Sequence, residues 1–107
     1  MNYLELREAM DHDSNDLKQF AKVLERELST AIDQLATALS REDAQQVADL
    51  KHKLKTSLHL VDATSIRDEL TAITEDLRHR RPISPSRKSR LLEMMRQLVQ
   101  ALSREKW

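Results

Sequence analysis

Hydrophobic and polar positions alternate along this chain with the period of a helix. Leucine, isoleucine, valine and alanine recur every three or four residues, which places them on one face of an amphipathic helix. Segments rich in Asp, Ser or Pro separate five such stretches, and these residue types begin or interrupt helices. The pattern predicts helices over residues 3–10, 15–39, 65–79 and 87–105, with another that carries His52 and ends near residue 61.

The connections between these helices are short, and the clearest loop covers residues 80–86. Short connections favour antiparallel neighbours. The longest hydrophobic stripe has a near-heptad spacing, which is typical of helices that pack at shallow angles. It consists of Leu17, Phe20, Leu24, Leu28, Ala31, Leu35 and Ala38. We therefore expect an all-α protein, an antiparallel up-down four-helix bundle with a short extra N-terminal helix. We expect one domain over residues 1–107, and a monomer, because four helices bury their own stripes.

The composition excludes several classes of function. Without glycine, the chain lacks the phosphate-cradling loops of ATP-binding and dinucleotide-binding enzymes. Without cysteine, it forms no disulfide, thiolate nucleophile or zinc finger. No apolar run approaches the roughly 18 residues that span a bilayer, and the first residues do not resemble a signal peptide. We expect a cytoplasmic protein without membrane insertion.

Charge gives the chain no general attraction to nucleic acid, because 18 basic residues balance 18 acidic ones. The strongest basic cluster lies within residues 78–90. Nucleic-acid binding favours stacking aromatics beside such a cluster, and the chain has one Trp, one Tyr and one Phe. We interpret the cluster as a solvated loop and expect no nucleic-acid binding. Contact with an acidic partner domain stays an alternative.

The third predicted helix turns His52 away from its own hydrophobic stripe. That stripe consists of Val47, Leu50, Leu54, Leu58 and Val61. His52 lies roughly 160° around the helix from Leu54, so it points to solvent. The residues that share its face are Ala48, Asp49, Lys55, Thr56 and His59. His52 and His59 are separated by about 10 Å along the helix axis, too far to ligate one metal ion, so we expect no metal site.

The segment His52-Lys53-Leu54-Lys55-Thr56-Ser57, followed by Asp62-Ala63, resembles a known motif. Histidine phosphotransfer (HPt) domains of bacterial phosphorelays carry His-x-Leu-Lys-Gly-Ser on a helix, followed by Gly-Ala. The resemblance covers about residues 13–77, with the predicted C-terminal helix beyond it. The sequence departs from the family pattern at Thr56 and Asp62, where the family has glycine.

The resemblance implies a phosphorelay carrier. His52 would accept a phosphoryl group from the aspartate of one receiver domain and pass it to another receiver. Lys55 would offset the added charge, and Ala48, Asp49, Thr56 and His59 would lie in the docking surface. The partners would be response-regulator receivers or a hybrid sensor kinase. Mg²⁺ would come with the receiver, so no intrinsic cofactor is expected.

Kinase activity is not expected, and two other functions stay open. In dimeric sensor kinases an acidic residue follows the phosphoacceptor, whereas this chain has Lys53 there. The first alternative is a non-transferring HPt-like bundle that acts as a protein-binding adaptor, which Thr56 and Asp62 favour. The second is a purely structural helical bundle or coiled-coil adaptor.

Overall fold

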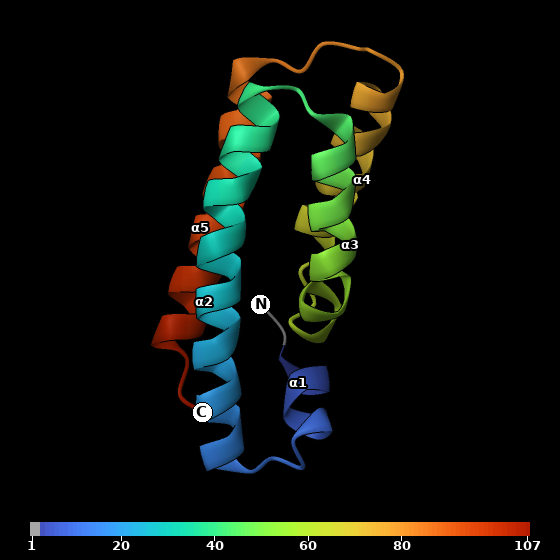
Figure 1. Cartoon of the computed structure of the whole chain (residues 1–107). Coiled ribbons are helices and arrows are strands. Elements are labelled where there is room, and N and C mark those ends of the chain that lie inside the picture. The colour runs from blue at the N-terminus through green and yellow to red at the C-terminus, as the bar shows by residue number, and fades with distance from the viewer. Residues whose placement is uncertain (1–2) are drawn as a thin grey trace.

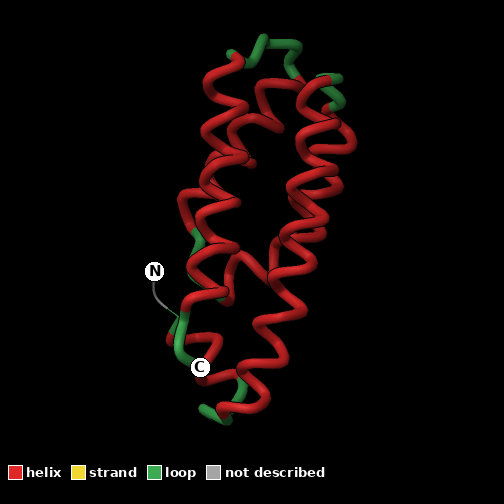
Figure 2. Tube along the Cα trace, turned by 90° about the vertical axis from the view of Figure 1, so that its left-hand side faces the viewer, coloured by secondary structure: helices red, strands yellow, loops and turns green. Residues whose placement is uncertain are grey.

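The computed structural model describes residues 3–107 as helices joined by short turns (Figures 1 and 2). The helices are α1 (Leu4–Ala9), α2 (Ser14–Ser40), α3 (Ala44–Leu60), α4 (Thr64–Arg78) and α5 (Pro85–Arg104). The molecule is elongated, with principal extents of 45 × 19 × 18 Å. No strand forms among the described residues, so the predicted all-α class is confirmed.

The four longer helices surround a hydrophobic core. Helix α2 packs against α3 and α5, and α4 packs against the same two helices. Helix α1 lies at one end, beside the beginning of α2 (Figure 1). Leucines from the predicted stripes fill the core, among them Leu17, Leu24, Leu28, Leu35, Leu54, Leu58, Leu70 and Leu91. None of the described helices is both long enough and apolar enough to cross a membrane.

Side-chain caps fix where three of the helices begin. Asp13 and Asp43 each accept a hydrogen bond at 3.0 Å from the backbone amide three residues later. In α5 the cap is Ser84, which accepts from the Arg87 amide at 3.2 Å. Pro85 therefore occupies the first turn, where its fixed φ and missing N–H suit a helix start. The predicted start at residue 87 is wrong, because proline interrupts a helix only beyond that turn.

Four helices are followed by non-glycine residues in the left-handed conformation. Asp11, Glu42, Asp62 and Arg80 follow α1, α2, α3 and α4 with φ of 51°, 50°, 54° and 57°. At the end of α3, the amide of Ala63 donates to the carbonyl of Leu58 at 2.9 Å, a bond that this conformation makes possible. Glycine is the usual residue at such positions because it has no Cβ to clash. Asp62, which replaces a glycine of the resembled motif, therefore carries backbone strain.

The two ends of the described chain are joined by side-chain contacts. Trp107 is half-buried, and its indole N–H donates to the carbonyl of Leu102 at 3.2 Å. Its ring lies 5.1 Å from the ring of Tyr3 and 5.1 Å from the guanidinium carbon of Arg7. Arg7 also pairs with Glu105 at 2.9 Å. These contacts attach α1 to the segment that follows α5.

Candidate functional site

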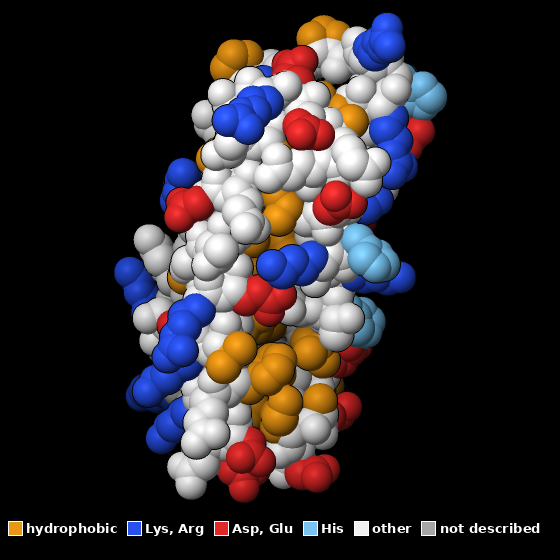
Figure 3. All heavy atoms as spheres, in the orientation of Figure 1, with side chains coloured by type: hydrophobic (Ala, Val, Ile, Leu, Met, Phe, Trp, Pro, Cys, Tyr) orange, Lys and Arg blue, Asp and Glu red, His pale blue; other side chains and the backbone are white. Residues whose placement is uncertain are grey.

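Helix α3 presents His52 to solvent because its other side is fixed in the core. Leu50 and Leu54 are 6% and 0% exposed, and they anchor α3 against its neighbours. His52 lies between them in sequence, on the opposite side of the helix, and is exposed. Figure 3 shows histidine and basic side chains close together along the edge that α3 and α4 form. The predicted orientation of this imidazole is the one observed.

His52 lines a groove between α3 and α4 with a volume of about 280 Å³. Lys51 and Lys55, one helical turn apart on α3, line the same groove. Arg67 and Thr71, also one turn apart, line it from α4. The groove therefore combines an imidazole with three basic side chains and a hydroxyl.

The basic residues of this groove have no acidic partners within residues 3–107. No carboxylate of that range lies within ion-pair distance of Lys51, Lys55 or Arg67. Other basic side chains of the protein do pair, for example Lys88 with Glu42 at 3.2 Å. Positive charge is therefore left uncompensated beside His52, which favours an anion there.

The other residues predicted to share the His52 face do not line this groove. Thr56 is exposed, and Ala48 is only 8% exposed, so Ala48 contributes more to the core than to the surface. Asp49 is exposed and accepts a hydrogen bond from the side-chain amide nitrogen of Gln45 at 2.8 Å. This hydrogen bond orients the Asp49 carboxylate along α3.

His59 lies further along α3, and its ring pairs with Glu5 of α1 at 2.9 Å. Both side chains are more than half exposed, so the pair contributes little to stability. His59 thus contacts the N-terminal helix, and of the two histidines of α3 only His52 lines the cationic groove.

The serine of the motif has a structural contact. Ser57 is only 9% exposed, and its hydroxyl donates to the carboxylate of Glu27 on α2 at 3.3 Å. This hydrogen bond joins α3 to α2 and satisfies a buried polar group. Ser57 therefore helps to fix the helix that carries His52.

Sequence reasoning missed Lys51, Arg67 and Thr71 as residues of the groove. A signal for them was present. The turn between α3 and α4 is centred near residue 62, so an antiparallel pairing places residues near 72 opposite His52. Arg67 and Thr71 follow the core residues Ile66 and Leu70, and this places both of them at the edge of the buried stripe.

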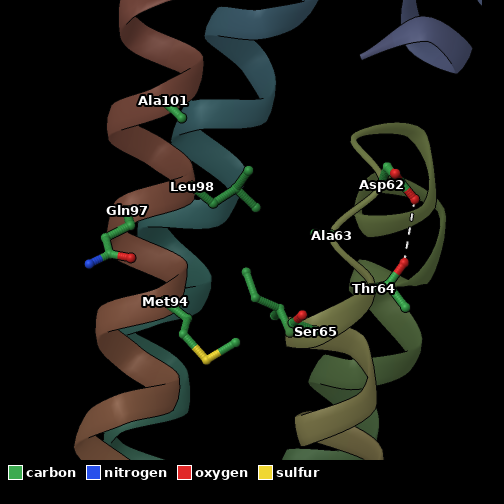
Figure 4. Close-up of a pocket in the computed structure, with 9 residues that line it drawn as sticks. Asp62, Ala63, Thr64, Ser65, Met94, Gln97, Leu98 and Ala101 are labelled. Atoms are coloured by element: carbon green, nitrogen blue, oxygen red, sulfur yellow. Dashed lines mark hydrogen bonds between the residues drawn. The ribbon is translucent and has the colours of Figure 1, made fainter. Parts of the chain in front are cut away.

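A larger groove, of about 520 Å³, lies where the α3–α4 turn faces α5 (Figure 4). It is lined by Ile66, Met94, Leu98 and Ala101 together with the polar residues of the turn and Gln97. None of the described residues that line it is a histidine or a basic residue. This groove therefore has no imidazole to accept a phosphoryl group and no cationic group to bind an anion.

The basic loop cluster is largely neutralised by acidic neighbours. Arg87 contacts Glu69 at 2.5 Å and Asp76 at 2.6 Å, and Arg81 contacts Asp76 at 2.8 Å. The hydrogen bond from Arg87 and the positive charge of Arg81 lower the pKa of the Asp76 carboxyl. These contacts hold α5 against α4, so Arg87, part of the cluster interpreted as a solvated loop, has a structural role.

A family model for the Hpt domain matches residues 19–101. The chain belongs to the Hpt domain family. No curated protein and no solved structure matches it. Hpt domains act by histidine phosphotransfer in phosphorelays, together with receiver domains. The resemblance noted in the sequence is thereby confirmed.

The surroundings of the four histidines distinguish one of them within this Hpt domain. His12 lies in the turn before α2, outside the matched residues. His59 and His79 each bond a glutamate, at 2.9 and 2.8 Å. His52 lies within the match, is exposed, and has no hydrogen-bond or ion-pair partner among the described residues. Among the histidines within the matched residues, His52 is therefore the one whose ring has no partner in the described part of the chain.

Proposed function

We propose that His52 is the phosphoacceptor of this Hpt domain. It would receive a phosphoryl group from the aspartate of one receiver and donate it to the aspartate of another. The observation that carries the proposal is the groove in which His52 lies beside three basic side chains that lack acidic partners in the described part of the chain. A phosphoryl group brings about −1.5 to −2 charges at neutral pH, which these side chains offset.

The transfer is a pair of in-line displacements. A neutral ring nitrogen of His52 attacks the phosphorus of the aspartyl phosphate, and a nitrogen–phosphorus bond forms as the oxygen–phosphorus bond breaks. The bonding electrons leave with the aspartate carboxylate, and the second ring nitrogen keeps its proton. The next receiver reverses these steps with its own aspartate. Lys55, one turn from His52, stabilises the charge on the phosphoryl oxygens.

The receiver would dock on the exposed side of α3. Asp49, Thr56 and His59 border His52 there, and the receiver would supply the Mg²⁺ for the reaction. An apolar depression at the turn between α1 and α2, lined by Met10, Phe20 and other residues, adds hydrophobic surface on the face shown in Figure 3. We also propose that α2 to α5 run in antiparallel up-down order and form one domain. The domain would act in the cytoplasm.

The test incubates the protein with a receiver that carries a radioactive phosphoryl group. Label should move to the wild type and should be stable in alkali and lost in acid, as expected for phosphohistidine. His52→Gln should accept none, whereas the matched variant His59→Gln should accept label. Label retained by His52→Gln would disprove the assignment, as would a wild type that no receiver of its own organism labels.

A second function is favoured by Thr56. This side chain is exposed one turn from His52, at a position where the family motif has glycine. Its methyl and hydroxyl groups would crowd a receiver that docks over His52. We propose as the alternative a non-transferring adaptor. It predicts that a receiver binds with the same affinity to wild type and to His52→Ala, and that no phosphoryl group is transferred.

A further inference from the structure

We infer that Arg67 of α4 binds the phosphate oxygens in the groove beside His52. This inference rests on the proposed function and extends it, because it assigns a contact to a helix that does not carry the histidine. Neither the motif on α3 nor the family match identifies Arg67 as a site residue.

Arg67 lines the groove from the helix opposite the one that carries His52. Arg67 and Thr71 form the α4 side of the groove, opposite Lys51 and Lys55 of α3. An anion bound next to His52 is therefore flanked by positive charge from both helices. The groove volume of about 280 Å³ is ample for a phosphoryl group, since one liquid water occupies about 30 Å³.

Arg67 also lacks an acidic partner, because its side chain pairs with no carboxylate among residues 3–107. The other arginines without such a partner in that range are exposed, whereas Arg67 is only partly exposed. A partly desolvated guanidinium without a counter-ion gains more from an arriving anion than a fully hydrated one does.

The guanidinium of Arg67 also suits a phosphate better than an ammonium group does. A guanidinium presents parallel N–H donors that bind two oxygens of one phosphate, whereas a lysine ammonium acts as a point charge. Lys51 and Lys55 supply general attraction, and Arg67 supplies orientation. The Thr71 hydroxyl donates to the carbonyl of Arg67 at 3.0 Å within α4.

The neighbouring acidic groups do not compete for Arg67. Asp68 follows it directly, about 100° around the helix, and is exposed. Asp49 on α3 accepts from Gln45 and does not line the groove. The groove is thus open to an external anion.

The first experiment needs no receiver. Inorganic phosphate is titrated into the unphosphorylated protein at constant ionic strength, and the NMR resonances of the His52 ring and the Arg67 guanidinium are followed. Wild type should show saturable shifts of both groups. Arg67→Gln should bind phosphate at least fivefold more weakly, Arg67→Lys should lie between the two, and Arg78→Gln, an exposed arginine of the same helix, should match wild type.

The second experiment measures the equilibrium of phosphoryl exchange with a receiver. Arg67→Gln should shift this equilibrium about tenfold toward the phosphorylated receiver, again with Arg78→Gln as the control. Circular dichroism of each variant confirms that it is folded, so a loss of binding is not a loss of structure. The equilibrium is a readout that a purely structural arginine would leave unchanged.

The two experiments separate the two claims. If receivers label His52 while Arg67→Gln equals wild type in phosphate affinity and in exchange, the inference about Arg67 is wrong and the proposed function stands. If no receiver labels the protein while phosphate binding depends on Arg67, the anion contact stands and the phosphorelay function is wrong. Phosphate shifts in wild type that do not saturate would also contradict the contact.

Discussion

Arg7 of α1 lies over the indole ring of Trp107, with its guanidinium carbon 5.1 Å from the ring centroid. The same guanidinium pairs with Glu105 at 2.9 Å, so one side chain makes a cation–π contact and an ion pair. Both contacts join residues that lie at opposite ends of the sequence. Helix α1 has six residues, too few to be stable by itself, and these contacts add to the packing that holds it in place.

Arg7→Met should lower the free energy of unfolding by about 1 kcal/mol, because the cation–π contact and the partly exposed ion pair are both lost. Trp107 is the single tryptophan, so its fluorescence reports the change directly. The measurement is urea unfolding followed by tryptophan emission. Arg26→Met, which changes an exposed arginine of α2, is the matched control and should leave stability within about 0.5 kcal/mol of wild type.

Ser57→Ala should destabilise the protein by about 1 kcal/mol relative to the control Ser29→Ala, which alters an exposed serine inside α2. The reason is that Glu27 loses the hydroxyl that donates to it at 3.3 Å. Comparing two serine-to-alanine changes within helices cancels the gain in helix propensity. Equal unfolding midpoints in urea for the two variants would show that this hydrogen bond contributes nothing.

Asp62→Gly should stabilise the protein by about 1 kcal/mol, because glycine adopts the φ of 54° without the Cβ clash. Arg80→Gly should act in the same direction after α4. Asp68→Gly, in the interior of α4, should instead destabilise by about 1 kcal/mol. Thermal unfolding of the three variants checks the sign of each change. A loss of stability on Asp62→Gly would show that its side chain outweighs the strain.

The Arg87–Asp76 contact should make stability depend on pH. The pKa of Asp76 is lower in the folded protein than in the unfolded chain, so the folded state binds fewer protons. The resulting stabilisation is fully present above the unfolded pKa, about 3.9, and is lost as the pH falls through the lower folded pKa. Wild type should therefore be more stable than Arg87→Met at pH 7, and the difference should shrink below about pH 4. Urea unfolding over this pH range is the measurement, and a difference that stays constant would contradict it.

Thr56→Gly should raise the rate of phosphoryl transfer from a receiver and lower stability by about 0.5 kcal/mol. Removal of the side chain opens the surface beside His52, whereas glycine inside a helix loses more backbone entropy on folding. Single-turnover transfer gives the rate, and thermal unfolding gives the stability. Thr30→Gly, at an exposed position inside α2, is the control for a mid-helix glycine. An unchanged rate would show that Thr56 does not obstruct docking.

The helices of this protein were predictable because each carries a regular stripe of apolar residues. In α4, for example, Ile66, Leu70 and Ile73 are 3%, 0% and 0% exposed, as their spacing indicates. The orientation of His52 followed from the same periodicity. The start of α5 could not be predicted in this way, because a serine lies on each side of Pro85 and either could cap the helix. The structure shows that the Ser84 hydroxyl accepts from the amide of Arg87.

The α4 side of the candidate site was harder to predict. Which residues of α4 face His52 depends on the rotation of α4 about its own axis and on its shift along α3. Both are set by how Ile66 and Leu70 pack into the core. The buried stripe and the antiparallel pairing indicate only roughly which residues of α4 lie opposite His52, so the place of Arg67 in the groove became clear only when the two helices were placed together.

The side of α3 that carries His52 is separate from the side that carries its buried leucines. A phosphoryl group added to this ring, as proposed, would change the surface potential and would lie on the side of α3 opposite the buried leucines. The phosphorylated and unphosphorylated forms of the domain would therefore differ in surface charge and would have the same shape. A receiver would have to read that signal by direct contact, since nothing elsewhere on the molecule would report it.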